Sequence, residues 1–425
     1  MFKDKPQVLV AGAGPVGMFA ALALAKRGIR VQIVDTGRRA CSHSYALALH
    51  PGSLELMKDL GLLDQVHQNA CSVRSIVLCD PDGPKALIAL DQGESDSSLA
   101  VVRQSVMEDL FETALSRYDT EIQWQHEVCT VRNEAEHASA TVNRFEKDPH
   151  GIEVQFVLGA DGHNSQVRRA IGLDFPEIAA AQYYAVFEFK TDAGLLDELR
   201  IVLSKRTTDV LWPLPDGHCR WGFQLPDYSD TESEQFKDRL LAAGFGHFPT
   251  KRLKDGALGS ADSGDQPDLD EATLRTLIAE RAPWFKGSIE NLTWSTIVRF
   301  ERRMASAFGK GRVWLAGDAA HLTLPAGVQS MNVGMLEANQ LADSFASIIG
   351  GSDSLSSMHA YNDRWTATWR QLHGLEAGLR ATSSTDPWIA ARTDRLMACL
   401  PAHGAALAPL AAQLGLEVTS RVTGA

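Results

Sequence analysis

The sequence lacks the cysteine pattern of a disulfide framework or a zinc site. Its 6 cysteines are scattered, and none forms a CxxC pair or lies near a histidine at metal-ligand spacing. Both kinds of site depend on such spacings. Buried free thiols are the expected state, which favours a cytoplasmic protein without a metal site.

Positive charge is also in short supply. Lys and Arg number 41 against 53 Asp and Glu, giving a formal net charge of -12 at pH 7. An acidic chain is a poor ligand for the phosphates of nucleic acids and anionic membranes. A nucleic-acid partner is therefore not expected, whereas the charge says little about a small-molecule substrate.

Long hydrophobic runs are absent with one exception. Residues 8–25 carry no charge and are flanked by lysines, which imitates a signal or anchor segment. However, this run contains three glycines and a proline near its start, and the strand-like residues 29–34 follow it directly. A strand, a turn, a helix and a second strand explain the same residues, so no integral membrane segment is expected.

The 425 residues exceed a typical single domain, and their patterns predict a mixed α/β chain. Beyond the first unit, the expected elements are helices over 53–61 and 106–118, strands over 75–90 and 121–158, a mostly β segment over 175–300, a strand over 313–316 followed by a long helix, and helices from 355 to the end. Within the β segment, residues 251–270 are expected as exposed loop, and Asp268 or Asp270 as the cap of a helix over 269–284.

The first motif with chemical content is Gly12-Ala13-Gly14-Pro15-Val16-Gly17, a GxGxxG between a strand and a helix. Glycine permits the tight turn and lets backbone N–H groups approach a pyrophosphate at the helix N-terminus. Asp35 ends the second strand, where a carboxylate can accept both ribose hydroxyls and would repel a 2′-phosphate. This unit therefore predicts a site for FAD or NAD.

Two further motifs follow buried strands. Residues 159–168 contain Asp161-Gly162, which on their own predict a turn that caps a helix starting near Ser165. Residues 311–321 deliver Asp318 to a glycine turn, and residues 325–332 then begin a new helix. The free N–H groups of that helix start form an anion site, which suits a flavin that becomes negatively charged on reduction.

Together and in this order, the three motifs resemble those of the class A flavoprotein monooxygenases, the family of para-hydroxybenzoate hydroxylase. The likeness covers about residues 6–60, 100–174 and 300–345. It implies a Rossmann-like FAD-binding domain with an inserted β-sheet substrate domain and a helical C-terminal region. The corresponding boundaries are 1–72, 98–174 and 300–350 for the discontinuous FAD-binding domain, 73–97 and 175–299 for the substrate domain, and 351–425 for the C-terminal region.

The resemblance also implies a set of cofactor-binding residues. Those for the adenosine-pyrophosphate half are Gly12, Gly14, Gly17 and Asp35, and those for the rest of FAD are Asp161, Gly317, Asp318, Pro325, Gly327, Met331, Asn332 and, along the flavin chain, Arg103. Relatives often carry an arginine where this chain has His43 and Tyr45, and Arg38 or Arg39 is the candidate substitute. Val328 and Ser330 replace two glycines of the usual flavin loop, and Asp35 replaces a more common Glu.

The activity implied by the resemblance is hydroxylation of a small, aromatic or polyketide-like substrate. NADPH or NADH would dock transiently to reduce FAD, and O2 would then react through a flavin C4a-hydroperoxide. The protein would be a monomer or a homodimer. No catalytic residue is assigned, because each candidate base (Tyr183, Tyr184, His218 and His50) belongs to a residue type that more often packs in a core or lies on a surface.

Other interpretations stay open. Trp212, Trp221, Phe223 and Trp294 would line an aromatic pocket or simply pack between strands, and His321 is expected to support the fold around the flavin. Tyr361, Trp365 and Trp369 have the spacing of a core-facing helix stripe. An FAD-dependent reductase or dehydrogenase and a flavin-binding protein without turnover are the alternative functions. A halogenase is disfavoured, because residues 212–215 do not match its Trp-x-Trp-x-Ile-Pro segment.

Overall fold

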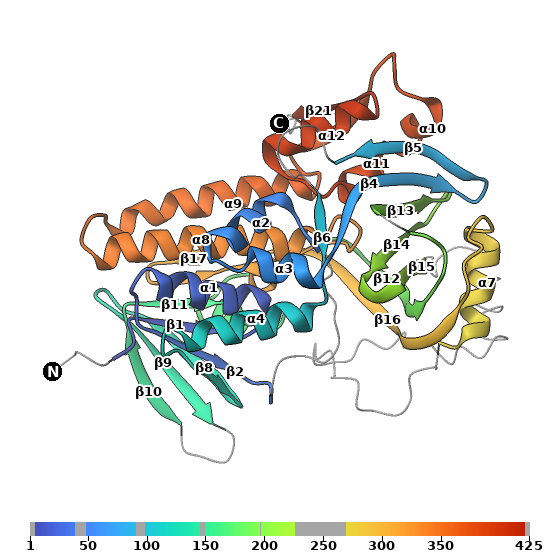
Figure 1. Ribbon diagram of the computed structural model, residues 1–425. Coiled ribbons are helices and arrows are strands. Elements are labelled where there is room, and N and C mark those ends of the chain that lie inside the picture. Colours follow the sequence, from blue (N-terminus) through green and yellow to red (C-terminus); the bar gives the residue numbers. More distant parts are fainter. Residues whose placement is uncertain are drawn as a thin grey trace.

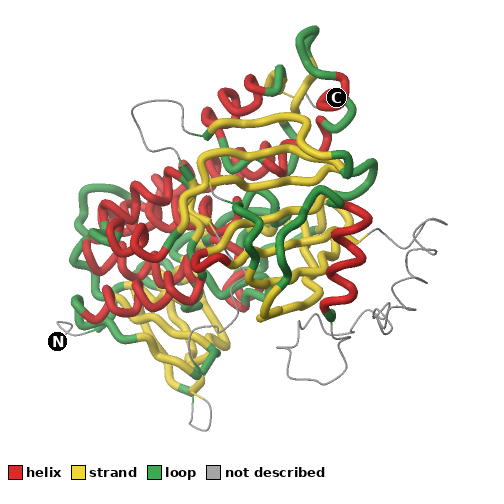
Figure 2. The backbone as a smooth tube through the Cα atoms, turned by 45° about the vertical axis from the view of Figure 1, so that its right-hand side comes forward, coloured by secondary structure: helices red, strands yellow, loops and turns green. Residues whose placement is uncertain are grey.

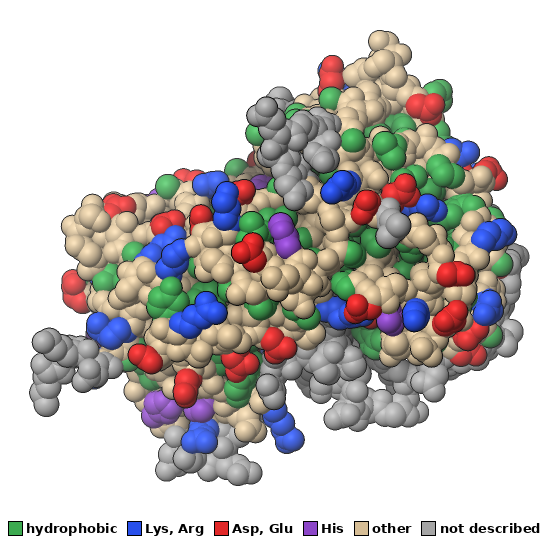
Figure 3. Space-filling model, viewed as in Figure 1, with side chains coloured by type: hydrophobic (Ala, Val, Ile, Leu, Met, Phe, Trp, Pro, Cys, Tyr) green, Lys and Arg blue, Asp and Glu red, His purple; other side chains and the backbone are tan. Residues whose placement is uncertain are grey.

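A computed structural model describes residues 5–38, 48–90, 98–144, 149–195, 197–225 and 269–420. It has the mixed α/β fold that the sequence predicts. Most of its long helices gather on one side and the strands of its largest sheet on the other (Figures 1 and 2). On the face shown in Figure 3, acidic and basic side chains are interspersed over the described surface. Among the described helices, none has the length and hydropathy of a membrane span.

A six-stranded sheet carries the three motifs. Its order is β17 (Gly309–Lys310), β18 (Val313–Leu315), β11 (Phe156–Gly159), β1 (Val8–Ala11), β2 (Val31–Asp35) and β7 (Ile122–Trp124). All neighbouring strands are parallel except β17 and β18. Each motif begins where β1, β11 or β18 ends, so the three loops emerge side by side at the carboxyl edge of the sheet. Open parallel sheets bind their ligands at that edge.

Helices cover one side of this sheet (Figure 1). They are α1 (Pro15–Lys26), α2 (Pro51–Asp59), α3 (Leu63–Asn69), α4 (Gln104–Ser116), α8 (Gln329–Ile349) and α9 (Met358–Leu372). The apolar α1 packs between α4 and α8. The aromatic stripe of α9 is buried as predicted, with Tyr361, Trp365 and Trp369 each at most 1% exposed. A three-stranded sheet of β8 (His126–Asn133), β9 (Ala138–Arg144) and β10 (His150–Val154) and the short helix α5 (Gln166–Ala170) complete this part.

A second, ten-stranded sheet forms the other half of the molecule. Its strands are β3 (Ala48–Leu49), β4 (Cys71–Asp80), β5 (Gly83–Ala89), β6 (Leu99–Val101), β12 (Glu177–Lys190), β13 (Asp197–Leu203), β14 (Thr208–Leu214), β15 (His218–Leu225), β16 (Glu290–Met304) and β19 (His321–Leu322). Helix α7 (Glu271–Arg281) packs on one face over Phe187, Trp221 and Phe223. Asp270 caps α7 as predicted, because its Oδ1 accepts a hydrogen bond from Thr273 N at 2.9 Å. Of the loop predicted over 251–270, residues 251–268 lie outside the described residues.

The C-terminal region differs in part from the prediction of helices to the end. Short helices α10 (Pro387–Ala390), α11 (Thr393–Leu396) and α12 (Leu407–Gln413) are present, but β20 (Ala377–Ala381) and β21 (Leu416–Ser420) form a two-stranded sheet. Each strand has only 5 residues. Because the pairing joins segments far apart in the chain, the local pattern does not reveal it. The region is held to the large sheet by Gln413, whose side-chain amide exchanges hydrogen bonds with the backbone of Ala89.

Candidate functional site

The three motif loops are in direct contact. Gly12 has a φ of 101°, and a Cβ at this position would overlap the carbonyl oxygen of Ala160 in the second motif. In the third motif, Gly317 has a φ of 63°, and a Cβ there would lie 3.1 Å from Val16 Cγ2. A Cβ at Gly17 would overlap the carbonyl of Gly12. Glycine at these positions is therefore required for the close approach of the loops.

Gly14 has a different environment. A Cβ built on Gly14 meets no protein atom within 4 Å. Gly14 is the N-cap of α1, and no side chain of the described residues caps that helix. The start of α1 thus has open space beside Gly14 and no side-chain cap, at the positive end of the helix dipole, which suits a pyrophosphate.

Asp35 ties the second strand to the first motif. Its Oδ2 accepts a hydrogen bond from Ala13 N at 2.7 Å, and its Oδ1 accepts one from Gly37 N at 2.6 Å. Carboxylate oxygens have further lone pairs, so both contacts leave capacity for a ribose hydroxyl. Arg38 is exposed just beyond this turn. Arg39, His43 and Tyr45 lie outside the described residues.

The second motif caps a helix and also presents unused polar atoms. Asp161 Oδ2 accepts hydrogen bonds from Gln166 N at 2.8 Å and Val167 N at 3.1 Å, and Ser165 caps α5 through Arg168 N. Asp161 Oδ1 and His163 Nε2 are buried without a hydrogen-bond partner among the described residues. Burial raises the pKa of Asp161. A ligand that donates a hydrogen bond here would relieve the cost of this desolvated oxygen.

Arg168 connects the second motif to the third. Its guanidinium donates to Ala319 O at 2.7 Å and to His163 O at 2.8 Å. Because both acceptors are backbone carbonyls of motif loops, Arg168 holds the relative position of the two loops. The arginine belongs to the motif as a sequence, but its role follows only from the structure.

A buried glutamate supports the third motif from below. Glu337 is 0% exposed, and its Oε2 accepts hydrogen bonds from Gly317 N and His321 Nε2, both at 2.9 Å. Its Oε1 accepts a third from Trp369 Nε1 at 2.7 Å. Sequence reasoning missed Glu337, although an acidic residue among the buried positions of an amphipathic helix is itself a signal. His321 contributes to the fold here, as expected, and its ring stacks on Trp369 at 3.7 Å between centroids.

Asp318, next to Gly317 in the third motif, makes no hydrogen bond with Glu337. It is exposed, and its Oδ1 accepts a hydrogen bond from Ser330 Oγ at 2.5 Å. Ser330 is one of the two departures from the usual glycine-rich loop, so the substitution has a visible consequence: the hydroxyl orients the carboxylate that the resemblance assigns to the ribityl chain.

The loop that the resemblance places beside the flavin ring is firmly held. Asn332 accepts a hydrogen bond from His50 N at 2.7 Å and donates to Ala48 O and Val328 O, each at 2.8 Å. Val328, the second departure, has a left-handed φ of 47°. A Cβ at Gly327 would lie 2.8 Å from Ala398 O, so the C-terminal region packs directly on this loop. Asn332 therefore fixes the loop through its side chain.

His50, a candidate base, takes part in the same arrangement. Its Nε2 lies 2.9 Å from Gly327 O, and burial lowers its pKa to about 3. The neutral ring donates this hydrogen bond, which makes His50 a clamp on the loop.

A cavity of about 350 Å³ lies beside the loop that begins α8, between that loop, the large sheet and the C-terminal region. Its wall includes Leu324 and Ala326 of the loop, Tyr184 of β12, Arg302 of β16 and His373 after α9. Side chains alternate between the two faces of a strand. Tyr184 therefore faces the cavity, whereas its neighbours Ala185 and Phe187 face α7.

The other predicted pocket residues lie elsewhere. Trp221 and Phe223 are buried against α7 on the opposite face of the sheet, so the packing interpretation holds for them and the aromatic-pocket interpretation is wrong. Trp212 is buried in the main core, and Trp294 lies against Arg220. Of the four candidate bases, only Tyr184 lines the cavity: Tyr183 packs towards α7, and His218 bonds to Asp216 O at 3.2 Å.

Arg103 is the N-cap of α4, and its Nη1 lies 3.8 Å from Asp216 Oδ2 in a weak ion pair. Met331 and Pro325 are half-buried on the loop.

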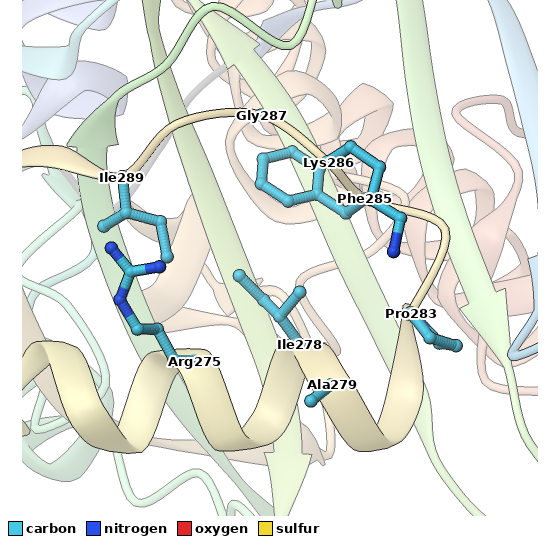
Figure 4. Close-up of a pocket in the computed structure, with 8 residues that line it drawn as sticks. All are labelled: Arg275, Ile278, Ala279, Pro283, Phe285, Lys286, Gly287 and Ile289. Atoms are coloured by element: carbon cyan, nitrogen blue, oxygen red, sulfur yellow. The ribbon is translucent and has the colours of Figure 1, made fainter.

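A second, more open cavity of about 280 Å³ lies between α7 and residues 283–289, and Arg275 and Ile278 contribute to its wall (Figure 4). Because α7 lies at the opposite end of the molecule from α1 in Figure 1, this cavity is remote from the motifs.

The residues present fit an FAD. The space at Gly14 and the free start of α1 suit a pyrophosphate, and the unpartnered Asp161 Oδ1 and the outward Asp318 carboxylate are acceptors for a polar chain. The three loops thus define a dinucleotide-binding α/β protein with an adjoining cavity.

Comparison with known proteins agrees with this class. A family described as "FAD binding domain" matches residues 5–373, and the chain belongs to that family. The resemblance to class A flavoprotein monooxygenases is thereby confirmed.

Curated relatives are similar over most of the chain. The chain is 27% identical to 6-methylpretetramide 4-monooxygenase of Streptomyces rimosus over 425 residues, which is 99% of this chain and 66% of the relative. It is 23% identical to a 3-(3-hydroxy-phenyl)propionate/3-hydroxycinnamic acid hydroxylase of Mycobacterium sp. (strain JLS), over 97% of this chain and 65% of the relative. The chain thus spans about two thirds of the length of these relatives.

Solved structures share the fold. The crystal structure of p-nitrophenol 4-monooxygenase PnpA from Pseudomonas putida DLL-E4 superposes with a TM-score of 0.68 at 22% identity, covering 97% of this chain and 93% of that one. The flavin-dependent monooxygenase PieE, solved with FAD and substrate, gives a TM-score of 0.67 at 18% identity over 87% of this chain and 62% of that one.

Proposed function

We propose that this protein is an FAD-dependent monooxygenase that uses NADPH or NADH and O2 to hydroxylate a small aromatic or polyketide-like substrate. The observation that carries the proposal is the 350 Å³ cavity whose wall includes the loop assigned to the flavin ring. A substrate in this cavity would lie beside the redox ring. The curated relatives are named as monooxygenases or hydroxylases, which supports the same activity.

The cofactor-binding residues would be those of the three loops. Gly12 and Gly17 bring the loops together, Gly14 leaves room for the pyrophosphate, and Asp35 and Asp318 accept hydroxyl groups of the ribose and ribityl chain. Bound FAD, once reduced by a nicotinamide, supplies the activation of O2.

The remaining tasks fall to the protein. Buried Glu337 fixes the backbone of Gly317, and Asn332 and His50 fix the loop at Gly327 and Val328. The C-terminal region closes the cavity on the loop side, which excludes water from the reacting atoms. Tyr184 Oη lines the cavity and donates a hydrogen bond to Gln182 Oε1 at 3.3 Å, so its oxygen would accept a hydrogen bond from a substrate hydroxyl. Burial raises the pKa of Tyr184 well above the ordinary value, so the phenol stays neutral.

We also propose a division of labour along the chain. Residues 1–72, 98–174 and 300–350 would bind FAD, residues 73–97 and 175–299 would bind substrate, and residues 351–425 would close the cavity. Strand β6 pairs with β4 in the large sheet, and β3 pairs with β6, so the two units share a sheet at their junction. We propose a reducing, cytoplasmic location, which the five free cysteines in the described residues support. The protein would act as a monomer or a homodimer.

The test is product analysis after turnover with isotopically labelled O2 and NADPH or NADH. We expect one labelled oxygen atom in the hydroxylated product and faster nicotinamide oxidation when substrate is present. Nicotinamide oxidation without oxygen uptake would instead identify a reductase or dehydrogenase. A yellow protein that neither nicotinamide bleaches would identify a flavin-binding protein without turnover.

A further inference from the structure

The cavity beside the flavin loop is positively charged in an otherwise acidic chain. Three arginines line it, Arg206, Arg302 and Arg395, against the single carboxylate of Asp394. The whole chain has a formal net charge of -12. A local excess of positive charge in a half-enclosed space raises the local concentration of anions.

Arg302, one of these three cations, has no counter-ion among the described residues. Its Nη2 donates to the carbonyl oxygen of His373 at 2.5 Å, and no carboxylate of the described part lies within ion-pair distance. By contrast, Arg299 and Arg303 on the same strand both pair with Glu301 and Glu177. Burial lowers the pKa of Arg302, so the guanidinium carries a desolvation cost that an anionic ligand would offset.

Arg395 has another role. Its guanidinium donates to Ser204 O at 2.7 Å and Thr207 O at 2.9 Å, and it follows Asp394 in the chain. These contacts hold the C-terminal region against the turn between β13 and β14. Arg302 is therefore the better anchor for a ligand.

His373 and Tyr184 add polar groups to the same wall. His373 is 4% exposed, and neither ring nitrogen makes a hydrogen bond of good geometry within the described residues, although the backbone of Arg303 lies nearby. Burial and repulsion by Arg302 lower the pKa of His373 to about 3. The neutral ring thus offers one donor and one acceptor, and Tyr184 Oη already donates to Gln182 Oε1 at 3.3 Å.

The size of the cavity limits the ligand. A cavity of about 150 Å³ holds benzene, so about 350 Å³ suits one or two aromatic rings with their substituents. Apolar wall residues such as Leu324 and Leu372 suit the ring faces.

We propose that this cavity binds a one- or two-ring aromatic carboxylate, with Arg302 as the specificity-determining residue that pairs with the carboxylate and His373 as a hydrogen-bonding partner of the ligand. This inference rests on the proposed function only in taking the cavity as the substrate site. It narrows the substrate class from aromatic compounds in general to their anions.

The experiment is calorimetric titration of the FAD-loaded protein with 3-hydroxybenzoate and 6-hydroxy-2-naphthoate, each against its neutral primary amide. Hydrogen bonds to charged groups are worth more than neutral ones, so we expect each acid to bind about tenfold or more tightly than its amide. Arg302→Gln should reduce this preference to about twofold or less. Arg302→Lys should keep part of it, because the charge remains but the bidentate geometry is lost.

The matched control is Arg299→Gln, three positions earlier on β16, where the guanidinium is 39% exposed and paired with Glu301. This variant should keep the wild-type preference. Flavin content and circular dichroism identify a variant that fails to fold. If Arg302→Gln fails to fold, the ratio of acid to amide affinity in the wild type and in Arg302→Lys tests the proposal instead.

Several outcomes would overturn the proposal: equal binding of acids and amides to the wild type, no binding of either acid at millimolar concentration, or an unchanged preference in Arg302→Gln. Failure of the proposed function has a separate signature. Acid binding that depends on Arg302 without any substrate-stimulated oxygen uptake would retain the ligand class and refute the oxygenase. Hydroxylation of neutral phenols without acid binding would retain the oxygenase and refute the proposed ligand class.

Discussion

The nucleotide cradle, made by the loops after β1, β11 and β18, and the cavity beside it are built in different ways. In the cradle, the backbone of Gly12 lies against that of Ala160, and Gly317 lies against Val16 of the first motif. In the cavity, side chains such as Arg302 and His373 define the surface, and they come from a strand of the large sheet and the segment after a helix. The cradle therefore constrains residue type strictly, whereas the cavity constrains only which side chains point inward.

The largest expected effect tests the cradle side of this contrast. Gly12→Ala forces a Cβ onto the Ala160 carbonyl at a positive φ, and we expect it to lower the free energy of unfolding by more than about 4 kcal/mol. Gly14→Ala is the matched control, since its Cβ meets no protein atom. It should cost about 1 kcal/mol or less in stability yet weaken FAD binding at least about tenfold.

Thermal unfolding of the FAD-free variants and fluorescence titration with FAD separate these two effects. If Gly14→Ala bound FAD as tightly as the wild type, the space at the start of α1 would not be the pyrophosphate site.

The next effect concerns Glu337, which serves the cradle through a side chain. Glu337→Ala leaves the N–H groups of Gly317, His321 and Trp369 without their acceptor. We therefore expect the free energy of unfolding to fall by about 3 kcal/mol or more. Glu337→Gln retains the shape and one acceptor oxygen and should be milder. Chemical denaturation measures both, and equal stability of Glu337→Ala and wild type would remove Glu337 from the support of the motif.

Asp318 and Ser330 allow a finer distinction between contact and orientation. Asp318→Ala should lower FAD affinity about tenfold to a hundredfold and leave the fold largely intact, because it removes a hydroxyl acceptor at an exposed position. Ser330→Gly removes only the hydrogen bond that orients this carboxylate, so its effect should stay within about fivefold. FAD titration ranks the two, and unchanged flavin content in Asp318→Ala would contradict the ribityl assignment.

A further effect is the pH dependence of stability that His50 causes at the border of cradle and cavity. The pKa of His50 is lowered to about 3 in the folded state, whereas an unfolded histidine titrates near 6.5. Between these values the unfolded chain binds the extra proton, so stability falls as pH falls, by about 1.4 kcal/mol per pH unit for this residue. His50→Gln should flatten that slope in denaturation curves between about pH 6 and pH 4, and the exposed His67→Gln should leave it unchanged.

The same contrast explains how much the sequence predicts. The β-α-β start, the three loops and their order were readable, because glycines at fixed spacings report what the backbone must do. Asp35, Asp161 and Asp318 lie at the ends of the predicted strands. Their proposed contacts with FAD are still predictions.

The side-chain features were largely hidden. Trp221 and Phe223 were candidates for a pocket and instead pack against α7. The sequence does not distinguish the two, because a strand buried on both faces has apolar residues at successive positions. Arg302 and Glu337 were not singled out, because each acquires its meaning from residues distant in the chain. The pairing of β20 with β21 was missed for the same reason.

Equilibrium titration of the FAD-free protein with FAD asks whether the three loops form one FAD site. We expect a yellow complex that saturates at one FAD per chain. A colourless protein that takes up no FAD would contradict the cradle and, with it, the proposed oxygenase.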